Sequence, residues 1–167
     1  MKGKWAQGIA PRNFAWIIKD RLAVSERPGG YARSHRPVRR QEEIIWIREQ
    51  GFGRVVSLIS SPANLHNYDE LGVAYVHRPF GPADDPAEFA AAFYPELRDL
   101  VATSAPVLVH QEELGDRISG LMAGYLLWAG LLPSGPQAIS VVERIVDRQM
   151  GPAGRELVAL SVGLAGG

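Results

Sequence analysis

The stretch from Pro106 to Gly120 constrains the fold of this chain more than any other part of the sequence. It places a short apolar strand, Val107–Val109, directly before a polar loop from His110 to Asp116. Arg117 follows, and the apolar run from Leu121 to Gly130 is long enough for a helix. A strand that leads through a short loop into a helix forms an anion cradle, because the loop amides and the helix dipole point the same way. The stretch therefore predicts a buried strand with an anion-binding loop at its end.

Composition excludes several classes of function. The 167 residues carry no net charge at neutral pH, so no overall field attracts the chain to nucleic acid or to an anionic membrane. The sequence contains no cysteine, which excludes disulfides, thiolate metal sites and thiol catalysis within these residues. We expect neither a nucleic-acid partner nor a membrane partner, and the composition does not predict an oligomeric state.

The hydropathy pattern gives no targeting or membrane segment. The first residues, Met1 to Gly8, are polar, unlike a secretory signal. The longest apolar run, Ile118 to Leu132, is shorter than the roughly 20 residues that cross a bilayer. We therefore expect a cytoplasmic protein.

Strand patterns alternate with helix patterns along the chain. Two short strands with a turn at Lys19-Asp20 are expected within residues 14–25, and further strands at 54–60, 73–77 and 107–109. Helices are expected at 41–50, 62–71, 87–103, 121–130, 137–148 and 152–164. No internal boundary or repeat is evident after a loose arm at residues 1–12. The pattern predicts one α/β domain over residues 13–167, with a mostly parallel central sheet flanked by helices.

A basic segment lies between the first strand pair and the first helix. Residues 31–40 contain Arg33, His35, Arg36, Arg39 and Arg40. A charge run of this kind usually forms a solvated loop leading into a helix. The alternative is a basic rim beside the 110–116 loop that recognises an anionic partner.

The ordered set of elements resembles a known family over nearly the whole chain. Residues 14–25, Arg54-Val-Val-Ser-Leu-Ile and the stretch from Gly72 to Phe80 are similar in order and type to the strands of the dual-specificity branch of the cysteine-dependent protein-tyrosine phosphatases. The spacing from Arg117 to the pair Tyr125-Leu126, and the helix from Gln137 to Ile145, are also similar to that family. The resemblance implies the dual-specificity phosphatase fold and a phosphate-binding loop at residues 110–118.

That loop departs from the family pattern at the positions that carry the chemistry. Gln111 stands where the family has its nucleophilic cysteine, and an amide cannot attack phosphorus as a thiolate does. Leu114 replaces the family's loop glycine, with Gly115 one place later, and Ile118 replaces the hydroxyl residue after the arginine. Glu112, Glu113 and Asp116 add carboxylates that would oppose a bound dianion. The resemblance therefore implies a fold without classical phosphatase activity.

Other positions of the family's site remain, each with two interpretations. Arg117 corresponds to the phosphate-clamping arginine, but it could instead pair with Glu112 or Glu113. Asp84 and Asp85 lie where the family has its general acid, yet an aspartate directly before Pro86 is also a helix N-cap. His110 is expected to orient the loop by hydrogen bonds.

Our leading hypothesis is a catalytically inactive, phosphatase-like binding or regulatory module, a pseudophosphatase. His110, Gln111, Arg117, Asp84 and Asp85 would then be vestigial catalytic positions. An anionic or phosphorylated partner would contact the anion-binding set Arg117, Gly115, Ile118 and Ser119, with the basic segment nearby. No cofactor or metal is expected, and a protein partner is a further possibility.

Two alternatives come from other classes. Glu112, Glu113, Asp116, Asp84 and Asp85 could support hydrolysis without a thiol, with or without a hard metal such as Mg²⁺, although no spacing matches a metal motif. The apolar helix with Leu121, Tyr125 and Trp128 could instead pack in a homodimer, although an ordinary core helix shows the same pattern.

Overall fold

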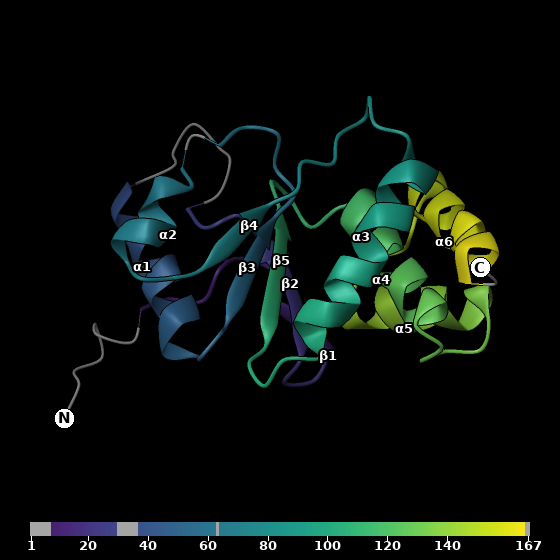
Figure 1. The fold of residues 1–167 in the computed structure, drawn as a ribbon, viewed down its shortest axis with the longest axis horizontal. Coiled ribbons are helices and arrows are strands. Elements are labelled where there is room, and N and C mark those ends of the chain that lie inside the picture. The colour runs from purple at the N-terminus through teal and green to yellow at the C-terminus, as the bar shows by residue number, and fades with distance from the viewer. Residues whose placement is uncertain (1–7, 30–36, 63, 166–167) are drawn as a thin grey trace. The chain divides into compact units, whose positions relative to one another are not determined.

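The described residues form two compact units. The computed structural model describes residues 8–29, 37–62 and 64–165. Unit 1 comprises Met1–Gly81 and Thr103–Glu113, and unit 2 comprises Pro82–Ala102 and Leu114–Gly167. Among the described residues, unit 1 contains the sheet and two helices, whereas unit 2 contains helices only (Figure 1). Residues 1–7 of the expected arm lie outside the described residues, so the boundary at residue 12 stays a prediction.

A five-stranded mixed sheet forms the centre of unit 1, in the order β1-β2-β5-β3-β4. The strands are β1 (Ala15–Ile18), β2 (Leu22–Glu26), β3 (Arg54–Ser57), β4 (Tyr75–His77) and β5 (Val107–Gln111). β1 pairs with β2 antiparallel through the turn at Lys19-Asp20, and the other three strand pairs are parallel. The predicted α/β class with a mostly parallel sheet is confirmed.

The central strand is longer, and the loop after it shorter, than the sequence pattern predicts. The pairing of β5 continues past Val109, because His110 lies opposite Ser57 of β3 and Gln111 opposite Glu26 of β2. Helix α4 then begins at Asp116. The expected loop of residues 110–116 is therefore corrected to residues 112–115. The pairing of His110 with both β2 and β3, and of Gln111 with β2, overrides the polarity of these two residues.

Helix α1 (Pro37–Glu49) begins four residues before the predicted start at Gln41. Proline is well placed in the first turn of a helix, where its missing N–H has no intrahelical partner. Ile44 and Ile47 are buried, whereas Ile45 is only partly buried. Helix α2 (His66–Glu70) is shorter than the predicted helix at 62–71.

An apolar core holds α1 and α2 to the sheet of unit 1. It consists of Ala23, Ile44, Ile47, Phe52, Val55, Leu65, Tyr68, Val73 and Leu108. Phe14 and Trp16, from the first strand region, pack against this core with edge-to-face and stacked aromatic contacts. Burial of these side chains fixes the position of α1, which carries part of the site described below.

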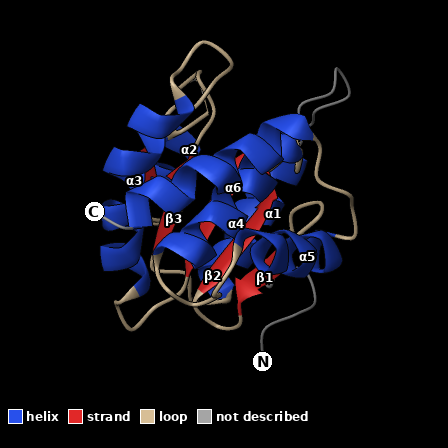
Figure 2. Cartoon of the chain, turned by 90° about the vertical axis from the view of Figure 1, so that its right-hand side faces the viewer, coloured by secondary structure: helices blue, strands red, loops and turns tan. Residues whose placement is uncertain are grey.

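The described part of unit 2, residues 82–102 and 114–165, forms four helices. They are α3 (Pro86–Val101), α4 (Asp116–Trp128), α5 (Gly135–Val146) and α6 (Pro152–Ala165). α4 packs against both α5 and α6 (Figure 2). Pro95 lies inside α3, which continues past it as one helix. Ser134 caps α5 by accepting a hydrogen bond from the amide of Gln137.

Glycines allow α4 and α6 to approach closely. A Cβ on Gly120 would overlap the backbone of Gly154, and one on Gly124 would overlap the side chain of Ser161. The hydroxyl of Tyr94 donates to the carbonyl of Leu121 at 3.0 Å, which joins α3 to α4. α4 is thus a core helix of its unit.

Two readings of the apolar helix pattern can now be separated. Leu121 and Tyr125, proposed above as a dimer surface, are buried, and Trp128 is partly buried. The ordinary-core interpretation is therefore the correct one for Leu121 and Tyr125. Among the described residues, no helix is both long enough and apolar enough to cross a membrane.

Candidate functional site

Gln111 is held by unit 1 through both its side chain and its backbone. Its side-chain amide donates to the carbonyl of Phe80 at 3.2 Å. Its own carbonyl accepts from the amide of Arg27 at 2.7 Å, which extends the β2–β5 pairing by one bond. The side chain therefore links the central strand to the segment after β4, which is a structural role.

His110 is buried at the carboxyl end of β5. Its Nε2 is hydrogen-bonded to the hydroxyl of Tyr68 at 3.1 Å. Burial, followed by the charges of Arg27 and His77, lowers the pKa of His110 to about 3, so the imidazole is neutral at neutral pH. Burial also raises the pKa of the Tyr68 phenol. This is a pair of neutral polar groups inside the core.

A pocket lies where three parallel strands of unit 1 end. Arg27 follows β2, Ser57 ends β3 and His110 lies near the end of β5, and all three line the pocket. In parallel sheets, ligands bind beyond the carboxyl ends of the strands, because the loops that follow them converge there. The pocket encloses about 390 Å³ of empty space, part of it open to solvent.

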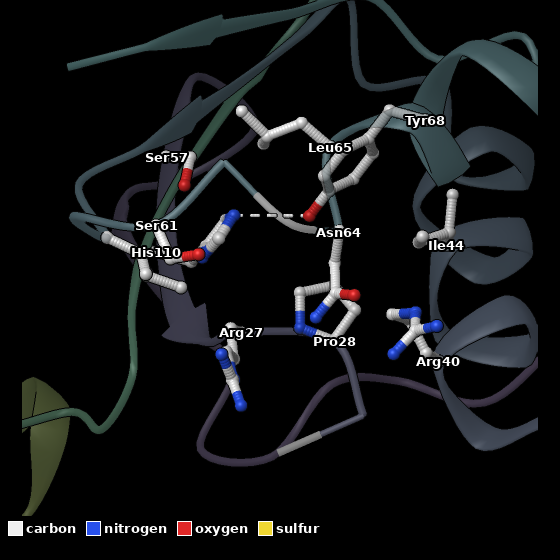
Figure 3. Close-up of a pocket in the computed structure, with 11 residues that line it drawn as sticks. Arg27, Pro28, Arg40, Ile44, Ser57, Ser61, Asn64, Leu65, Tyr68 and His110 are labelled. Atoms are coloured by element: carbon white, nitrogen blue, oxygen red, sulfur yellow. Dashed lines mark hydrogen bonds between the residues drawn. The ribbon is translucent and has the colours of Figure 1, made fainter. Parts of the chain in front are cut away.

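The remaining lining of the pocket comes from the segment after β2, from α1, from the segment between β3 and α2, and from α2 itself. It consists of Pro28, Arg40, Ile44, Ile59, Ser61, Asn64, Leu65 and Tyr68. Figure 3 shows Ser57, Ser61 and His110 on one side, Arg40 and Ile44 of α1 on the other, and Tyr68 and Asn64 between them. The lining is apolar in part, with hydroxyl, amide, imidazole and guanidinium groups added.

The two arginines give the pocket a positive charge. The Nε of Arg40 donates to the side-chain oxygen of Asn67 at 2.7 Å, which orients its guanidinium. Burial lowers the pKa of Arg40, and the neighbouring charge of Arg27 lowers it further. Arg40 belongs to the basic segment singled out in the sequence, whereas Arg33, His35 and Arg36 lie outside the described residues.

The predicted anion-binding residues lie at the start of α4 in unit 2. Gly115 is the N-cap, and Arg117, which is partly buried, lies in the first turn. Ile118 is fully buried, and the amide of Ser119 donates to the carbonyl of Gly115 at 3.2 Å, within the helix. The first amides of the helix, not that of Ser119, are the ones a helix N-terminus offers to an anion. Binding of an anion here stays a prediction.

Asp116 is engaged by another helix of unit 2. One carboxylate oxygen accepts from the amide of Gly151 at 2.6 Å, and the other accepts from that of Gly154 at 2.7 Å. These amides lie at the N-terminus of α6, whose partial positive charge a carboxylate stabilises. Asp116 is therefore a cap of α6, which removes it from the group of acids considered above for hydrolysis.

Asp84 and Asp85 are both exposed in unit 2. Asp85 is the N-cap of α3 and accepts from the amide of Ala87 at 3.1 Å, with Pro86 at the first helical position. The cap interpretation of Asp85 is thus confirmed. Glu112 and Glu113, in unit 1, are exposed as well. Within residues 8–29, 37–62 and 64–165, no three His, Asp or Glu side chains converge as metal ligands would.

The sequence did not identify Ser57, Tyr68 or Arg27 as members of a site. Ser57 lies inside an apolar strand and Tyr68 inside a short helix, so neither stands out by type or spacing. The available signal was topological. Because β2, β3 and β5 are parallel neighbours, the residues that end them must meet at one edge of the sheet.

The chain is similar to solved phosphatase structures over nearly its whole length. It matches Tk-PTP in the active form with a TM-score of 0.70 and 19% identity, covering 90% of this chain and 95% of the other. It matches kinase associated phosphatase, with serine in place of its catalytic cysteine, with a TM-score of 0.77 and 16% identity, covering 95% and 98%.

A bacterial structure gives a similar result. A cysteine-to-serine form of P. aeruginosa TpbA in complex with pTyr matches with a TM-score of 0.64 and 18% identity, covering 98% of this chain and 97% of the other. No protein-family model matches the sequence, and no curated protein sequence matches it significantly. At these identities the likeness shows the fold alone. This chain has the α/β fold of the dual-specificity and protein-tyrosine phosphatases, and it has no cysteine.

Proposed function

We propose that this chain is a phosphatase-like binding or regulatory module without thiol phosphatase activity, a pseudophosphatase. The observation that carries the proposal is Gln111, which stands where the resemblance implies the nucleophile and whose side-chain amide donates to the carbonyl of Phe80. The chain contains no cysteine that could act as the nucleophile from another position. The fold persists, whereas the group that would attack phosphorus is absent.

The proposed ligand of this module is an anionic or phosphorylated partner at the start of α4. Arg117 supplies a guanidinium, and the 13-residue helix supplies the positive end of its dipole. Among the similar structures, TpbA is in complex with pTyr, which makes a phosphotyrosine peptide a suitable probe. The exposed acids Glu112 and Glu113 would favour a partner that also carries positive charge.

Calorimetric titration with a phosphotyrosine peptide tests the binding part of the proposal. We expect heat of binding that is lost in Arg117→Gln and retained in Arg144→Gln, an exposed arginine of α5. Absence of heat at millimolar peptide would refute anion binding at this helix and leave a protein-interaction role.

Turnover of p-nitrophenyl phosphate tests the inactive state. We expect none above the buffer rate from the natural chain or from Gln111→Ala. Turnover that survives Gln111→Ala but is lost when Glu112 and Glu113 are replaced would support hydrolysis without a thiol and contradict the proposal.

A further inference from the structure

Two buried polar atoms in the pocket of unit 1 have no hydrogen-bond partner among the described residues. They are the hydroxyl of Ser57 and the Nδ1 of His110, and their side chains are 1% and 2% exposed. The two residues are register partners on the adjacent parallel strands β3 and β5, and both line the pocket. Buried polar groups are nearly always paired, so an unpaired couple facing one cavity indicates a missing partner there.

The charge of the pocket indicates what that partner carries. Two lining residues, Arg27 and Arg40, are cationic, and none of the described lining residues is acidic. The charge of Arg27 acts on both Arg40 and His110. Of the nearby acids, Glu70 acts on Arg40 and favours its charged form, whereas Glu43 is buried, accepts from the amide of Gly29 and pairs with Arg39 at 3.6 Å. An anion in the pocket would relieve the repulsion between the two arginines.

The surface of the pocket favours a ligand with an apolar part. Ile44, Ile59 and Leu65 contribute apolar surface, as most small-molecule sites do. Two fixed positive charges match a phosphate monoester, which carries about two negative charges at neutral pH, better than they match a single carboxylate.

We propose that this pocket is a binding site for a small phosphomonoester. The guanidinium groups of Arg27 and Arg40 bind the phosphate oxygens, and the hydroxyl of Ser57 and the imidazole of His110 complete the polar contacts of the ligand. The apolar side chains contact its organic part. The pocket lies entirely within unit 1 and does not include Arg117. The inference therefore stands or falls separately from the proposed function.

Titration of the folded chain with phenyl phosphate, inorganic phosphate and acetate tests the site. We expect phenyl phosphate to bind more tightly than inorganic phosphate if the ligand is an organic monoester. Equal affinities would mean that the pocket recognises phosphate alone. The proposed oxyanion contacts would then stand, and the proposed contacts with an organic part would be refuted. Acetate that binds as tightly as either phosphate would overturn the choice of a phosphate.

Matched variants assign the binding to the pocket. We expect Ser57→Ala and Arg40→Gln each to weaken phenyl phosphate binding by roughly tenfold, the effect of losing one hydrogen bond to a charged group. Ser60→Ala, at the exposed end of the same segment, and Arg48→Gln, exposed on the same helix, should bind within about twofold of the natural chain. If Arg117→Gln alone removes binding and Ser57→Ala and Arg40→Gln have no effect, the pocket is not the site.

Nuclear magnetic resonance of the histidine side chains distinguishes a ligand from an ordered water. Phenyl phosphate should shift the ring nitrogen resonances of His110 in a saturable way, with the affinity that calorimetry gives, and should leave those of the exposed His66 unchanged. Resonances of His110 that do not move at millimolar ligand would show that water alone pairs Ser57 and His110, which refutes the proposal. Ser57→Ala removes a single oxygen, so it provides the binding test even if Arg40→Gln does not fold.

Discussion

At the residue scale, the candidate site residues differ in how completely hydrogen bonds satisfy their side chains. Gln111 has a definite bond to the backbone of Phe80, and Asp116 has two bonds to the amides of α6. Both are structural roles in positions where the resemblance led us to consider chemistry. His110 is the opposite case, because one of its nitrogens is bonded to Tyr68 and the other faces a pocket.

The buried His110 should make stability depend on pH. Its folded pKa of about 3 lies below the ordinary value near 6.5, so the unfolded chain binds a proton that the folded chain rejects. The stability it contributes is complete above pH of about 6.5 and is lost as the pH falls toward 3, by at most about 1.4 kcal/mol per pH unit. Urea unfolding between pH of about 7.5 and 4.5 measures this slope.

The His110→Asn variant should lack the pH-dependent stability that His110 contributes. The free energies of unfolding of the variant and of the natural chain should therefore converge as the pH falls. His66→Asn, at an exposed position, is the control and should keep the natural slope. Burial raises the pKa of Glu43, which acts in the opposite direction but equally in all three proteins. Parallel pH profiles for the natural chain and His110→Asn would contradict the buried, neutral state of His110.

Removal of the Asp116 carboxylate should destabilise unit 2. Asp116→Ala leaves the amides of Gly151 and Gly154 without their acceptor, at a cost of about 1–3 kcal/mol in free energy of unfolding. Glu113→Ala, at an exposed loop position, should change it by less than about 0.5 kcal/mol. Chemical denaturation of both variants checks this, and equal effects would mean that the cap contributes nothing.

At the scale of elements, the contact between α4 and α6 depends on the absence of side chains. Gly120 and Gly154 place two helix backbones against each other, and Gly124 makes room for Ser161 and Tyr94. In the sequence these glycines are only interruptions of an apolar run. Their pairing joins residues far apart in the chain, so no local pattern could reveal it.

Alanine substitutions on the two helices should therefore change the free energy of unfolding in opposite directions. Gly120→Ala forces a Cβ into the backbone of Gly154 and should lower the free energy of unfolding by about 1–3 kcal/mol or more. Gly163→Ala, on α6 with open space around it, should raise that free energy by about 0.5–1 kcal/mol, because alanine is the better helix former. Thermal and urea unfolding would reveal the signs, and destabilisation by both would contradict this packing.

Element boundaries show where local pattern was sufficient. The apolar periodicity located all four helices of unit 2 to within a few residues, except that α4 begins at Asp116 and not at Leu121. It also found each strand of the sheet. The early start of α4 was missed because Asp116, Arg117 and Ser119 are polar, although Ile118 and Ser119 are buried. Tertiary burial, which the local sequence does not display, decides this boundary.

At the scale of the whole molecule, two of the departures from the phosphatase pattern contribute to stability. Leu114 is 6% exposed and Ile118 is fully buried, both within unit 2. Leu114→Gly would leave a cavity and Ile118→Thr would bury a hydroxyl, so introducing the residues that the resemblance implies would remove core packing. Leu114 and Ile118 therefore belong both to the loop region that resembles the phosphatase site and to the packed core of unit 2.

The triple variant Gln111→Cys, Leu114→Gly and Ile118→Thr should consequently be less stable by several kcal/mol. Gln111→Cys alone should lose less than the triple variant, because it mainly removes the bond to Phe80. Unfolding curves give the stabilities, and turnover of p-nitrophenyl phosphate by the folded fraction shows whether activity returns. A triple variant as stable as the natural chain would mean that Leu114 and Ile118 do not contribute as their burial indicates.

The fold class could be predicted from the sequence, because it depends on ordered local patterns. The pocket could not, because Arg27, Ser57 and His110 come from three strands whose adjacency is a property of the whole sheet. The cap formed by Asp116 was equally hidden, since its partners lie more than thirty residues away.

The strand order has a consequence for how the chain folds. β5 lies between β2 and β3, so residues 107–111 join two strand pairs that are formed from the first 77 residues. During synthesis, β2 and β3 therefore present unpaired inner edges until β5 leaves the ribosome, and closing the sheet requires contacts between residues as distant as Leu22 and Val107. Such long-range pairing slows folding and leaves exposed edges open to association with other chains. The central strand that positions His110 and Gln111 thus also controls when the nascent chain becomes safe from aggregation.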